Sequence, residues 1–588
     1  MSLKAHFPIL LAHRDVAAQS VAGVRLRQIQ QALQADGWHT LVVDNEADAG
    51  IVAGAHRGLA AIVFRAETLQ KDSPTARRAM ALMNAVHQRA PGLPVIALGE
   101  TAALEGTSPK AVQALRNLHG VLYLYEDTVS FLARQIMRAA EDYLDQLLPP
   151  FFKALTHHAE RSAYSWHTPG HAGGVGFLKS PAGYALHQFF GENTLRSDLS
   201  ISVPELGSLL DHTGPVKDAE AYAAQVFGAD HTYFVTNGTS TANKIVWHSM
   251  AGRDDLVIVD RNCHKSLLHS LIMTGATPIY FTPSRNDYGT IGPISLEQFS
   301  PAAIRKKIEA SPLARGKKGH VRIAVVTNST YDGLCYNAEK IKAVVADQVD
   351  ALHFDEAWYA YAAFHEFYAG RHAMGVPRGH PRADHTLVFA THSTHKLLAG
   401  ISQASQIIVQ NSQTRKLDLP IFNEAYLMHT STSPQYAIIA SCDVSAAMME
   451  PPGGTALVEE SLNEALDFRR AMRKVDDEWG KDWWFKVWGP ERLSAEGIRR
   501  DDWILRANEK WHGFGNLASG FNILDPIKAT IITPGLDVSG KFAKTGIPAS
   551  IVTKYLAEHG VIVEKTGLYS FFIMFTIGIT KGRWNTLL

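Results

Sequence analysis

Short apolar runs alternate with longer helical stretches in the first 130 residues of the chain. Five of these runs have the length and composition of buried β-strands: residues 8–11, 40–43, 60–64, 94–98 and 120–124. A strand followed by a helix, repeated in this way, predicts a small parallel sheet with helices on both faces.

This first region, residues 1–130, resembles a response-regulator receiver domain with a flavodoxin-like fold. A receiver needs a phosphoacceptor aspartate after its third strand, whereas here that strand runs into Arg65-Ala66-Glu67. We therefore expect an assembly or regulatory ("wing") domain, with a signalling domain as the alternative.

The next part of the chain begins with a helical stretch, residues 129–148, which leads to Pro149-Pro150. We interpret residues 131–190 as a linker. Strand-like runs then resume, and polar or glycine-containing loops follow them, where ligands bind in open α/β sheets: residues 232–235, 256–259, 323–326, 351–354 and 386–390.

This pattern predicts an α/β fold class with a large domain over residues 191–430. Residues 431–588 mix helical stretches with strands such as 530–532, which predicts a smaller α+β domain.

Composition narrows the class of protein. The 588 residues include 57 basic and 57 acidic side chains, so nothing suggests a surface for nucleic acid or membrane. No apolar run approaches the roughly 20 residues of a membrane span. The three cysteines are scattered, which disfavours a disulfide framework or a zinc site and favours a cytoplasmic protein.

The segment Ser393-Thr394-His395-Lys396 carries the first candidate chemistry. It follows the apolar run 386–390 and precedes a loop of small residues, 397–400. A lysine at a strand end, beside a histidine and two hydroxyls, suits a Schiff-base lysine that holds an aldehyde cofactor with a phosphate tail. A surface lysine is the alternative.

A second segment, Thr236-Asn237-Gly238-Thr239-Ser240-Thr241, stands between a strand and the helical stretch 242–250. The glycine lets the backbone approach a phosphate, and free N–H groups at a helix start bind it, with hydroxyls as further donors. The alternative is an ordinary helix cap.

Two further residues follow predicted strands. His264 could stack on a flat heteroaromatic ring, or be an ordinary loop histidine. Asp355, in His353-Phe354-Asp355-Glu356-Ala357-Trp358, could pair with a protonated pyridine nitrogen, which keeps the ring an electron sink. A helix cap is the alternative, and no spacing typical of a metal site accompanies it, so we expect no metal.

Along the chain, a phosphate loop is followed by a histidine, an aspartate and a lysine. This order resembles that of the aspartate-aminotransferase-like (type I) fold of pyridoxal-phosphate enzymes. Four segments narrow the resemblance to the bacterial ornithine/lysine/arginine decarboxylase family: 165–171, 260–266, 327–333 and 393–398. Within that family the chain looks most like the proteobacterial lysine decarboxylases, on segments that include 360–368 and 563–569. The resemblance runs from the N-terminal domain to about Gly582.

The resemblance implies roles for these residues. Lys396 would hold pyridoxal 5'-phosphate, Asp355 would keep its ring nitrogen protonated, and His264 would stack on the ring. Thr239, Ser240 and Ser393 would hold the phosphate, and Gly238 would allow the backbone to approach it closely.

Proton transfer and substrate recognition are less defined. His395 and Lys396 are both candidates for returning a proton to the substrate Cα. Trp358 would shape the pocket, with a structural role as the alternative. Glu564 is a candidate partner for the distal cation of a basic amino acid, with a surface salt bridge as the alternative.

The implied reaction is decarboxylation of a basic amino acid, with L-lysine to cadaverine as the leading expectation. Each turnover would consume a proton, consistent with acid resistance or polyamine supply. Arginine or ornithine decarboxylation is the nearest alternative, followed by an aminotransferase or a non-enzymatic homologue. Members of this family usually continue into a further C-terminal domain, which we expect this chain, ending at Leu588, to lack.

We also expect a homodimer that forms the active site, because type I sites usually lie between two subunits. The loop 191–198 is a candidate contribution from the neighbouring subunit. A higher, decamer-like homo-oligomer would use the N-terminal domain.

Overall fold

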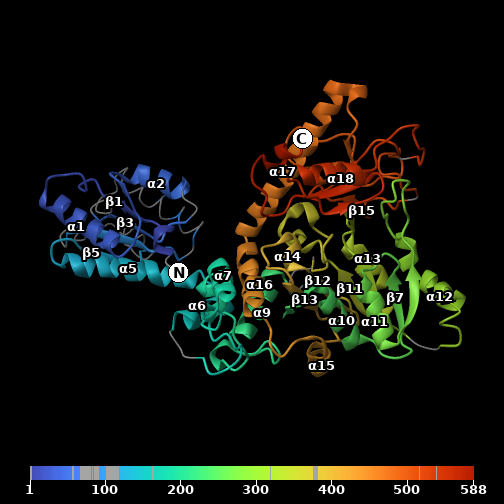
Figure 1. Cartoon of the computed structure of the whole chain (residues 1–588), viewed down its shortest axis with the longest axis horizontal. Helices are drawn as coiled ribbons and strands as arrows, with labels where there is room; N and C mark the ends of the chain where they lie inside the picture. Colours follow the sequence, from blue (N-terminus) through green and yellow to red (C-terminus); the bar gives the residue numbers. More distant parts are fainter. Residues whose placement is uncertain are drawn as a thin grey trace. The chain divides into compact units, whose positions relative to one another are not determined.

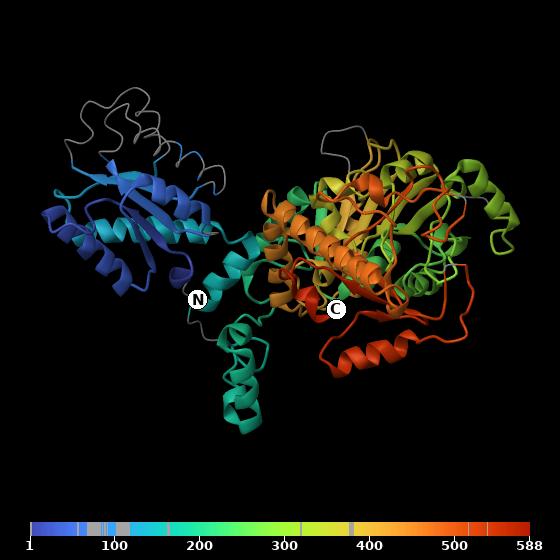
Figure 2. The same ribbon diagram turned by 90° about the horizontal axis from the view of Figure 1, so that it is seen from above.

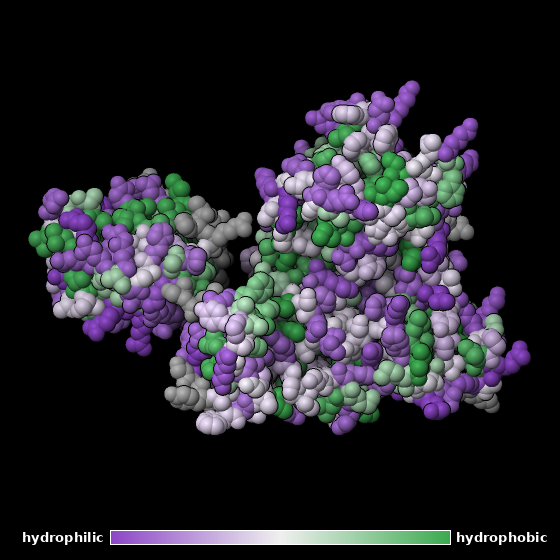
Figure 3. All heavy atoms as spheres, viewed as in Figure 1, coloured by the Kyte–Doolittle hydropathy of each residue, from purple (hydrophilic) through white to green (hydrophobic). Residues whose placement is uncertain are grey.

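A computed structural model describes residues 3–55, 58–66, 81, 84, 86, 90, 92–100, 118–161, 165–317, 320–374, 382–515, 517–537 and 539–588. The chain divides into two compact units, Met1–Leu148 and Pro149–Leu588. Hydrophilic and hydrophobic side chains are interspersed over the face shown in Figure 3.

The described residues of the first unit contain a five-stranded parallel sheet in the order β2-β1-β3-β4-β5. This order is flavodoxin-like, as expected. Its strands are β1 (Ile9–Ala12), β2 (Thr40–Val43), β3 (Ala61–Arg65), β4 (Val95–Gly99) and β5 (Gly120–Tyr123). Glu67, part of the receiver argument, lies outside the described residues.

Helices α1 (Val21–Ala35) and α5 (Val129–Gln146) pack against each other beside this sheet (Figures 1 and 2). Helix α2 (Glu46–Ala55) contacts β1 and β2. Thr128 caps α5 by accepting a hydrogen bond from the Phe131 N–H, and the helix buries an apolar face that includes Ile136. Helix α5 belongs to the core of the first unit. The boundary between the two units along the chain therefore lies after Leu148, later than the predicted limit at residue 130.

In the described part of the second unit, a seven-stranded sheet has the order β6-β13-β12-β11-β9-β7-β8. Its strands are β6 (His231–Val235), β7 (Leu256–Asp260), β8 (Thr277–Phe281), β9 (Val321–Thr327), β11 (Val349–Asp355), β12 (Leu387–His392) and β13 (Ser405–Gln410). Every residue of β11 and β12 is buried. Because successive side chains point to opposite faces, both faces of this sheet are covered.

Helices of the second unit connect these strands and extend beyond them. They are α6 (Pro150–Glu160), α7 (Pro181–Phe190), α8 (Glu192–Arg196), α9 (Gly214–Val226), α10 (Gly238–Met250), α11 (Lys265–Thr274), α12 (Pro301–Ala310), α13 (Ala338–Val345), α14 (Thr394–Leu397), α15 (Leu419–His429), α16 (Tyr436–Met449), α17 (Gly453–Trp479) and α18 (Ala549–Glu558). The region interpreted as a linker is thus largely helical.

The described part of the second unit also contains two smaller sheets. Strand β10 (Leu334–Tyr336) pairs with β15 (Asn522–Leu524). A four-stranded antiparallel sheet has the order β14-β16-β18-β17, with β14 at Lys486–Val487, β16 at Lys528–Ile532, β17 at Lys565–Thr566 and β18 at Ser570–Met574. One apolar core joins these sheets to the large one.

Strand direction in the large sheet brings distant loops together. Strands β7, β9, β11 and β12 are parallel neighbours, and β6 has the same direction because β13 is antiparallel to both β12 and β6. Their carboxyl ends, and the amino end of β13, therefore meet at one edge of the sheet.

Candidate active site

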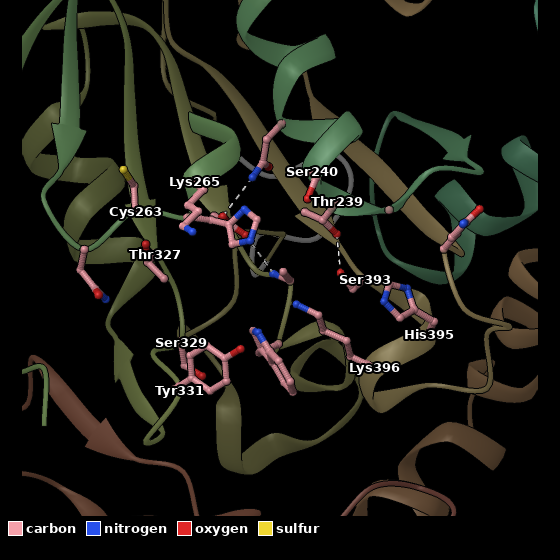
Figure 4. A pocket seen from close by; sticks show the side chains of 18 of the residues that line it. Thr239, Ser240, Cys263, Lys265, Thr327, Ser329, Tyr331, Ser393, His395 and Lys396 are labelled. Atoms are coloured by element: carbon pink, nitrogen blue, oxygen red, sulfur yellow. Dashed lines mark hydrogen bonds between the residues drawn. The ribbon is translucent and has the colours of Figure 1, made fainter. Parts of the chain in front are cut away.

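A cavity of about 650 Å³ lies at this edge of the sheet, within the roughly 300–1,000 Å³ typical of small-molecule sites. It is lined by Gly238, Thr239, Ser240, Asn243, Asn262, Cys263, His264, Lys265, Thr327, Ser329, Tyr331, Asp355, Ala357, Trp358, Ser393, His395, Lys396, Ser402 and Gln403. All site residues expected from the sequence except Glu564 are in this set. Figure 4 shows the Lys396 amine extending into the space between the Thr239–Ser393 wall and Tyr331.

Lys396 lies in α14, a single turn directly after β12. Its Nζ is 4.2 Å from the centre of the Trp358 ring. Burial lowers the pKa of the amine to about 8; the Asp355 carboxylate opposes this shift and the Lys528 amine reinforces it. A larger fraction of this amine is therefore neutral, and nucleophilic, than in an exposed lysine.

The opposite wall has the features of a phosphate site. Helix α10 begins at Gly238, earlier than the predicted residue 242, so Thr239 and Ser240 belong to its first turn. The first N–H groups of a helix have no partner within it and favour an anion. Thr239 Oγ1 lies 2.6 Å from Ser393 Oγ, which joins this turn to the lysine loop.

Gly238 has a left-handed conformation, with φ of 75°. An added Cβ would meet no atom within 4 Å, so the backbone angle rather than lack of space favours glycine here. The Gly238 N–H donates to the Gln403 carbonyl at 2.8 Å, which ties the helix start to the loop before β13.

Asp355 stands at the end of a hydrogen-bond chain whose direction is fully determined. Trp247 Nε1–H donates to His353 Nδ1 (3.3 Å), so the neutral ring donates from Nε2 to Thr391 Oγ1 (3.0 Å). The Thr391 hydroxyl donates to Asn243 Oδ1 (2.7 Å), and the Asn243 amide donates to Asp355 Oδ2 (3.1 Å). Burial lowers the pKa of His353 to about 4, in agreement with a neutral ring.

His264 is the cap residue of α11. Its Nδ1 accepts a hydrogen bond from the Ser266 N–H at 3.2 Å, and the ring lines the cavity. Burial lowers the pKa of this imidazole, and the Asp355 carboxylate opposes the shift. An uncharged ring of this kind can lie against a flat heteroaromatic ligand.

His395 also borders the cavity. Its Nδ1 lies 2.7 Å from the Ala404 carbonyl oxygen, which only accepts, so Nδ1 carries the hydrogen and Nε2 has a lone pair. Burial lowers the pKa of His395. In Figure 4 the ring lies beside Ser393.

Sequence reasoning missed several lining residues, among them Asn243, Ser329, Tyr331 and Gln403. Asn243 is one helical turn after Thr239, and the others lie in loops next to strands of the same sheet. Their position next to the ends of predicted strands was the feature of the sequence that could have identified them as lining residues. Glu564, by contrast, is exposed and does not line the cavity.

A buried cluster next to Asp355 also has the residue types of a metal centre: Glu356, His372 and His392. However, Nδ1 of His372 accepts from the Met374 N–H, and Nδ1 of His392 faces the Gln406 amide, so the hydrogens lie on the Nε2 atoms that face Glu356. Glu356 accepts hydrogen bonds from the Asn328 amide (3.0 Å) and the Ala373 N–H (2.9 Å) and lies 3.1 Å from His392 Nε2. This cluster is thus a carboxylate held by hydrogen-bond donors directly after β11.

Comparison with known proteins relates this geometry to a family. The model for "Orn/Lys/Arg decarboxylase, major domain" matches residues 149–583, and that for "Orn/Lys/Arg decarboxylase, N-terminal domain" matches residues 21–143. The chain belongs to the Orn/Lys/Arg decarboxylase family. It is therefore an amino-acid decarboxylase, and the expected family and fold class are confirmed.

Individual relatives of this decarboxylase cover nearly all of it. Lysine decarboxylase LdcA of Pseudomonas aeruginosa is 58% identical over 99% of the chain and 77% of the relative. The solved structure of lysine decarboxylase A from Pseudomonas aeruginosa has a TM-score of 0.88 and covers 100% of this chain, which spans 78% of that structure's chain. The biodegradative arginine decarboxylase of Escherichia coli is 42% identical over 86% of this chain and 69% of the relative.

Among the described residues, none of the helices combines the length and apolar character that crossing a membrane requires.

Proposed function

We propose that this protein decarboxylates L-lysine to cadaverine and carbon dioxide with pyridoxal phosphate as cofactor. The observation that carries the proposal is the meeting of Lys396, Asp355 and the α10 amino terminus in one cavity. The whole-chain similarity to a lysine decarboxylase supports the choice of substrate.

The residues present fit pyridoxal phosphate. The start of α10, with the Thr239, Ser240 and Ser393 hydroxyls, would hold the phosphate, and Asp355 would pair with the ring nitrogen. His264 would lie against the ring face, and Lys396 would hold the aldehyde carbon. When bound, this cofactor supplies an electron-accepting ring that stabilises the charge left at Cα as the carboxylate departs.

Each side chain then has a defined task. The hydrogen-bond chain that ends at Asn243 keeps Asp355 in place and oriented toward the cavity. Trp358 lies against the Lys396 amine and limits its contact with water. His395 presents a lone pair at Nε2 and Lys396 an amine, and either can carry the proton returned to Cα.

Substrate preference is tested by supplying lysine, arginine and ornithine separately and measuring carbon dioxide and the amine product. We expect cadaverine from lysine to form fastest. Faster turnover of arginine would overturn the substrate assignment, and a keto-acid product without carbon dioxide would indicate an aminotransferase.

Replacement of the lysine tests the cofactor assignment. Lys396→Ala should lose the visible absorption band of the bound cofactor and at least about 1,000-fold of the activity, because no other amine then holds the aldehyde carbon. Lys474→Ala, an exposed lysine on α17, is the matched control and should retain both. A Lys396→Ala protein that keeps the band would contradict the assignment.

We also propose that the protein is cytoplasmic and forms a homodimer, and that these dimers can assemble into a larger homo-oligomer. Helix α7 has no buried residue and exposes Tyr184, Phe189 and Phe190, which supports a partner at this helix. Light scattering on the purified chain tests the dimer, and a monomeric mass would contradict it.

A further inference from the structure

A fully buried lysine lies behind one wall of the cavity. Lys528 is the first residue of β16, and its exposed fraction is 0%. Lysine is rarely buried to this degree unless its charge is paired. Among the residues that the structure describes, no carboxylate forms an ion pair with this amine; its contacts are a hydroxyl, a carbonyl and the face of the Tyr359 ring. A salt bridge therefore does not account for the buried cation.

The Lys528 amine reaches the cavity through a single hydroxyl. Its Nζ donates hydrogen bonds to Ser329 Oγ and, at 3.4 Å, to the Thr330 carbonyl. Ser329 lines the cavity, whereas Lys528 and Thr330 do not. Figure 4 shows Ser329 beside Tyr331, across the cavity from Ser393. The serine thus stands between the cation and any ligand.

The direction of the Ser329 hydroxyl follows from these contacts. An ammonium only donates, so Ser329 Oγ accepts from Lys528 and its own hydrogen must point elsewhere. Within the described residues, the acceptor for that hydrogen is the Thr330 carbonyl at 3.5 Å, beyond the roughly 2.5–3.0 Å usual for O–H···O hydrogen bonds. The hydroxyl therefore has a hydrogen to offer to a ligand in the cavity.

The nearest acid along the strand does not neutralise the amine by direct contact. The Asp525 carboxylate is also buried, but it accepts hydrogen bonds from the Tyr361 and Tyr368 hydroxyls. Burial lowers the pKa of the Lys528 amine, and Asp525 opposes this shift. Burial also lowers the pKa of Lys396, and the positive charge of Lys528 adds to that effect, so this charge acts on a group inside the cavity.

We propose that Lys528 is a positioning residue that acts through Ser329: its ammonium holds the serine hydroxyl as a hydrogen-bond donor to an anionic oxygen in the cavity. The inference rests on the proposed function, which supplies two such oxygens, the ring oxygen of pyridoxal phosphate and the carboxylate of the amino acid. A hydroxyl polarised by an ammonium donates a stronger hydrogen bond than a hydroxyl without such a partner.

The indirect contact suits a reaction that releases the anion. A direct ion pair with the substrate carboxylate would stabilise the substrate more than the transition state, and this would slow the reaction. With Ser329 between them, Lys528 attracts the anion without forming that ion pair.

Four proteins test the role of Lys528: the unmodified protein, Lys528→Met, Ser329→Ala and the double variant. For each, we would measure the Kd for pyridoxal phosphate, the KM for lysine and the Ki for cadaverine, which has no carboxylate. Each single variant should weaken the Kd or the KM by about tenfold. The double variant should be no weaker than the weaker single variant, because the lysine acts through the serine.

The constant that changes identifies the oxygen. A weaker Kd for pyridoxal phosphate assigns the hydroxyl to the ring oxygen of the cofactor. A raised KM for lysine, with the Ki for cadaverine unchanged, assigns it to the substrate carboxylate.

The visible absorption band gives a readout that does not depend on turnover. Loss of a nearby cation makes protonation of the bound chromophore easier, so the midpoint of the pH titration of the band should rise by about one pH unit in Lys528→Met. The shift should be much smaller in Ser329→Ala, which removes no charge. Lys342→Met is the control, since the Lys342 amine donates to the Ala373 carbonyl and does not line the cavity; it should change neither the constants nor the midpoint.

Three results would overturn the role: a Kd and a KM that both stay within about twofold in a folded Lys528→Met protein, single effects that multiply in the double variant, or the same changes in Lys342→Met. If Lys528→Met does not fold, Ser329→Ala decides alone, and unchanged constants in that variant would refute the proposal. Failure of the proposed function is distinguishable, because the unmodified protein would then show no visible band with pyridoxal phosphate and release no carbon dioxide from lysine.

Discussion

Lys396 shows how burial changes the chemistry of a single side chain. An exposed lysine amine has a pKa near 10.4 and is almost entirely charged at neutral pH. At the end of β12, burial lowers that pKa to about 8. The charged form loses hydration that the cavity does not replace, so the neutral and reactive form becomes accessible.

The rate at which cofactor-free protein takes up pyridoxal phosphate should depend on pH accordingly. Because the neutral amine reacts, the rate should rise by about tenfold per pH unit below pH 8 and level off above it. Stopped-flow measurement of the visible band between pH 6 and 10 checks this. A rate that still rises steeply from pH 9 to 10, as for an exposed amine, would contradict it.

At the scale of elements, helix α10 and strands β11 and β12 are joined by the hydrogen-bond chain that ends at Asp355. Each link is buried and each donor has a defined acceptor. Thr391, on β12, is the middle link, so its hydroxyl holds the helix and both strands in register.

Thr391→Val should therefore lower the free energy of unfolding by about 1–3 kcal/mol, because His353 and Asn243 each lose a buried partner. Chemical denaturation measures this change. Thr194→Val, on the surface of α8 with a local hydrogen bond, is the control and should change stability by less than about 0.5 kcal/mol. Equal effects of the two variants would show that the chain does not stabilise the fold.

The strands of the large sheet could be predicted from the sequence more accurately than the helix starts and the contacts between distant residues. Buried parallel strands are continuous apolar runs, so the run 351–354 was recognisable as the centre of β11 (Val349–Asp355). The start of α10 was missed because Thr239 and Ser240 are poor helix formers that are tolerated in a first turn. Asn243 and Tyr331 were missed because their partners are far away in sequence, and only the sheet brings them together.

At the scale of the whole molecule, the candidate chemistry is confined to one unit. Every residue that lines the cavity belongs to Pro149–Leu588, and the first unit has an apolar core of its own. The two units thus have separable structural tasks.

A fragment of residues 149–588 should therefore still bind pyridoxal phosphate and show its visible band, since no site residue is removed. Absorption spectroscopy of the fragment beside the full chain checks this, with circular dichroism to confirm that it is folded. A folded fragment without the band would show that the first unit is needed for the site.

Strand β13 has a mechanical consequence for Lys396. Because β13 is antiparallel to β12, the chain returns to the sheet within residues 393–404, which hold only the single turn α14 and no crossover helix. The lysine loop is thus clamped at both ends, and the His395 N–H is further tied to the Ala404 carbonyl. The backbone on both sides of Lys396 is thus held by hydrogen bonds of the sheet and its loop. During a reaction cycle we expect the amine to change position by rotation about its own side-chain bonds rather than by movement of this backbone.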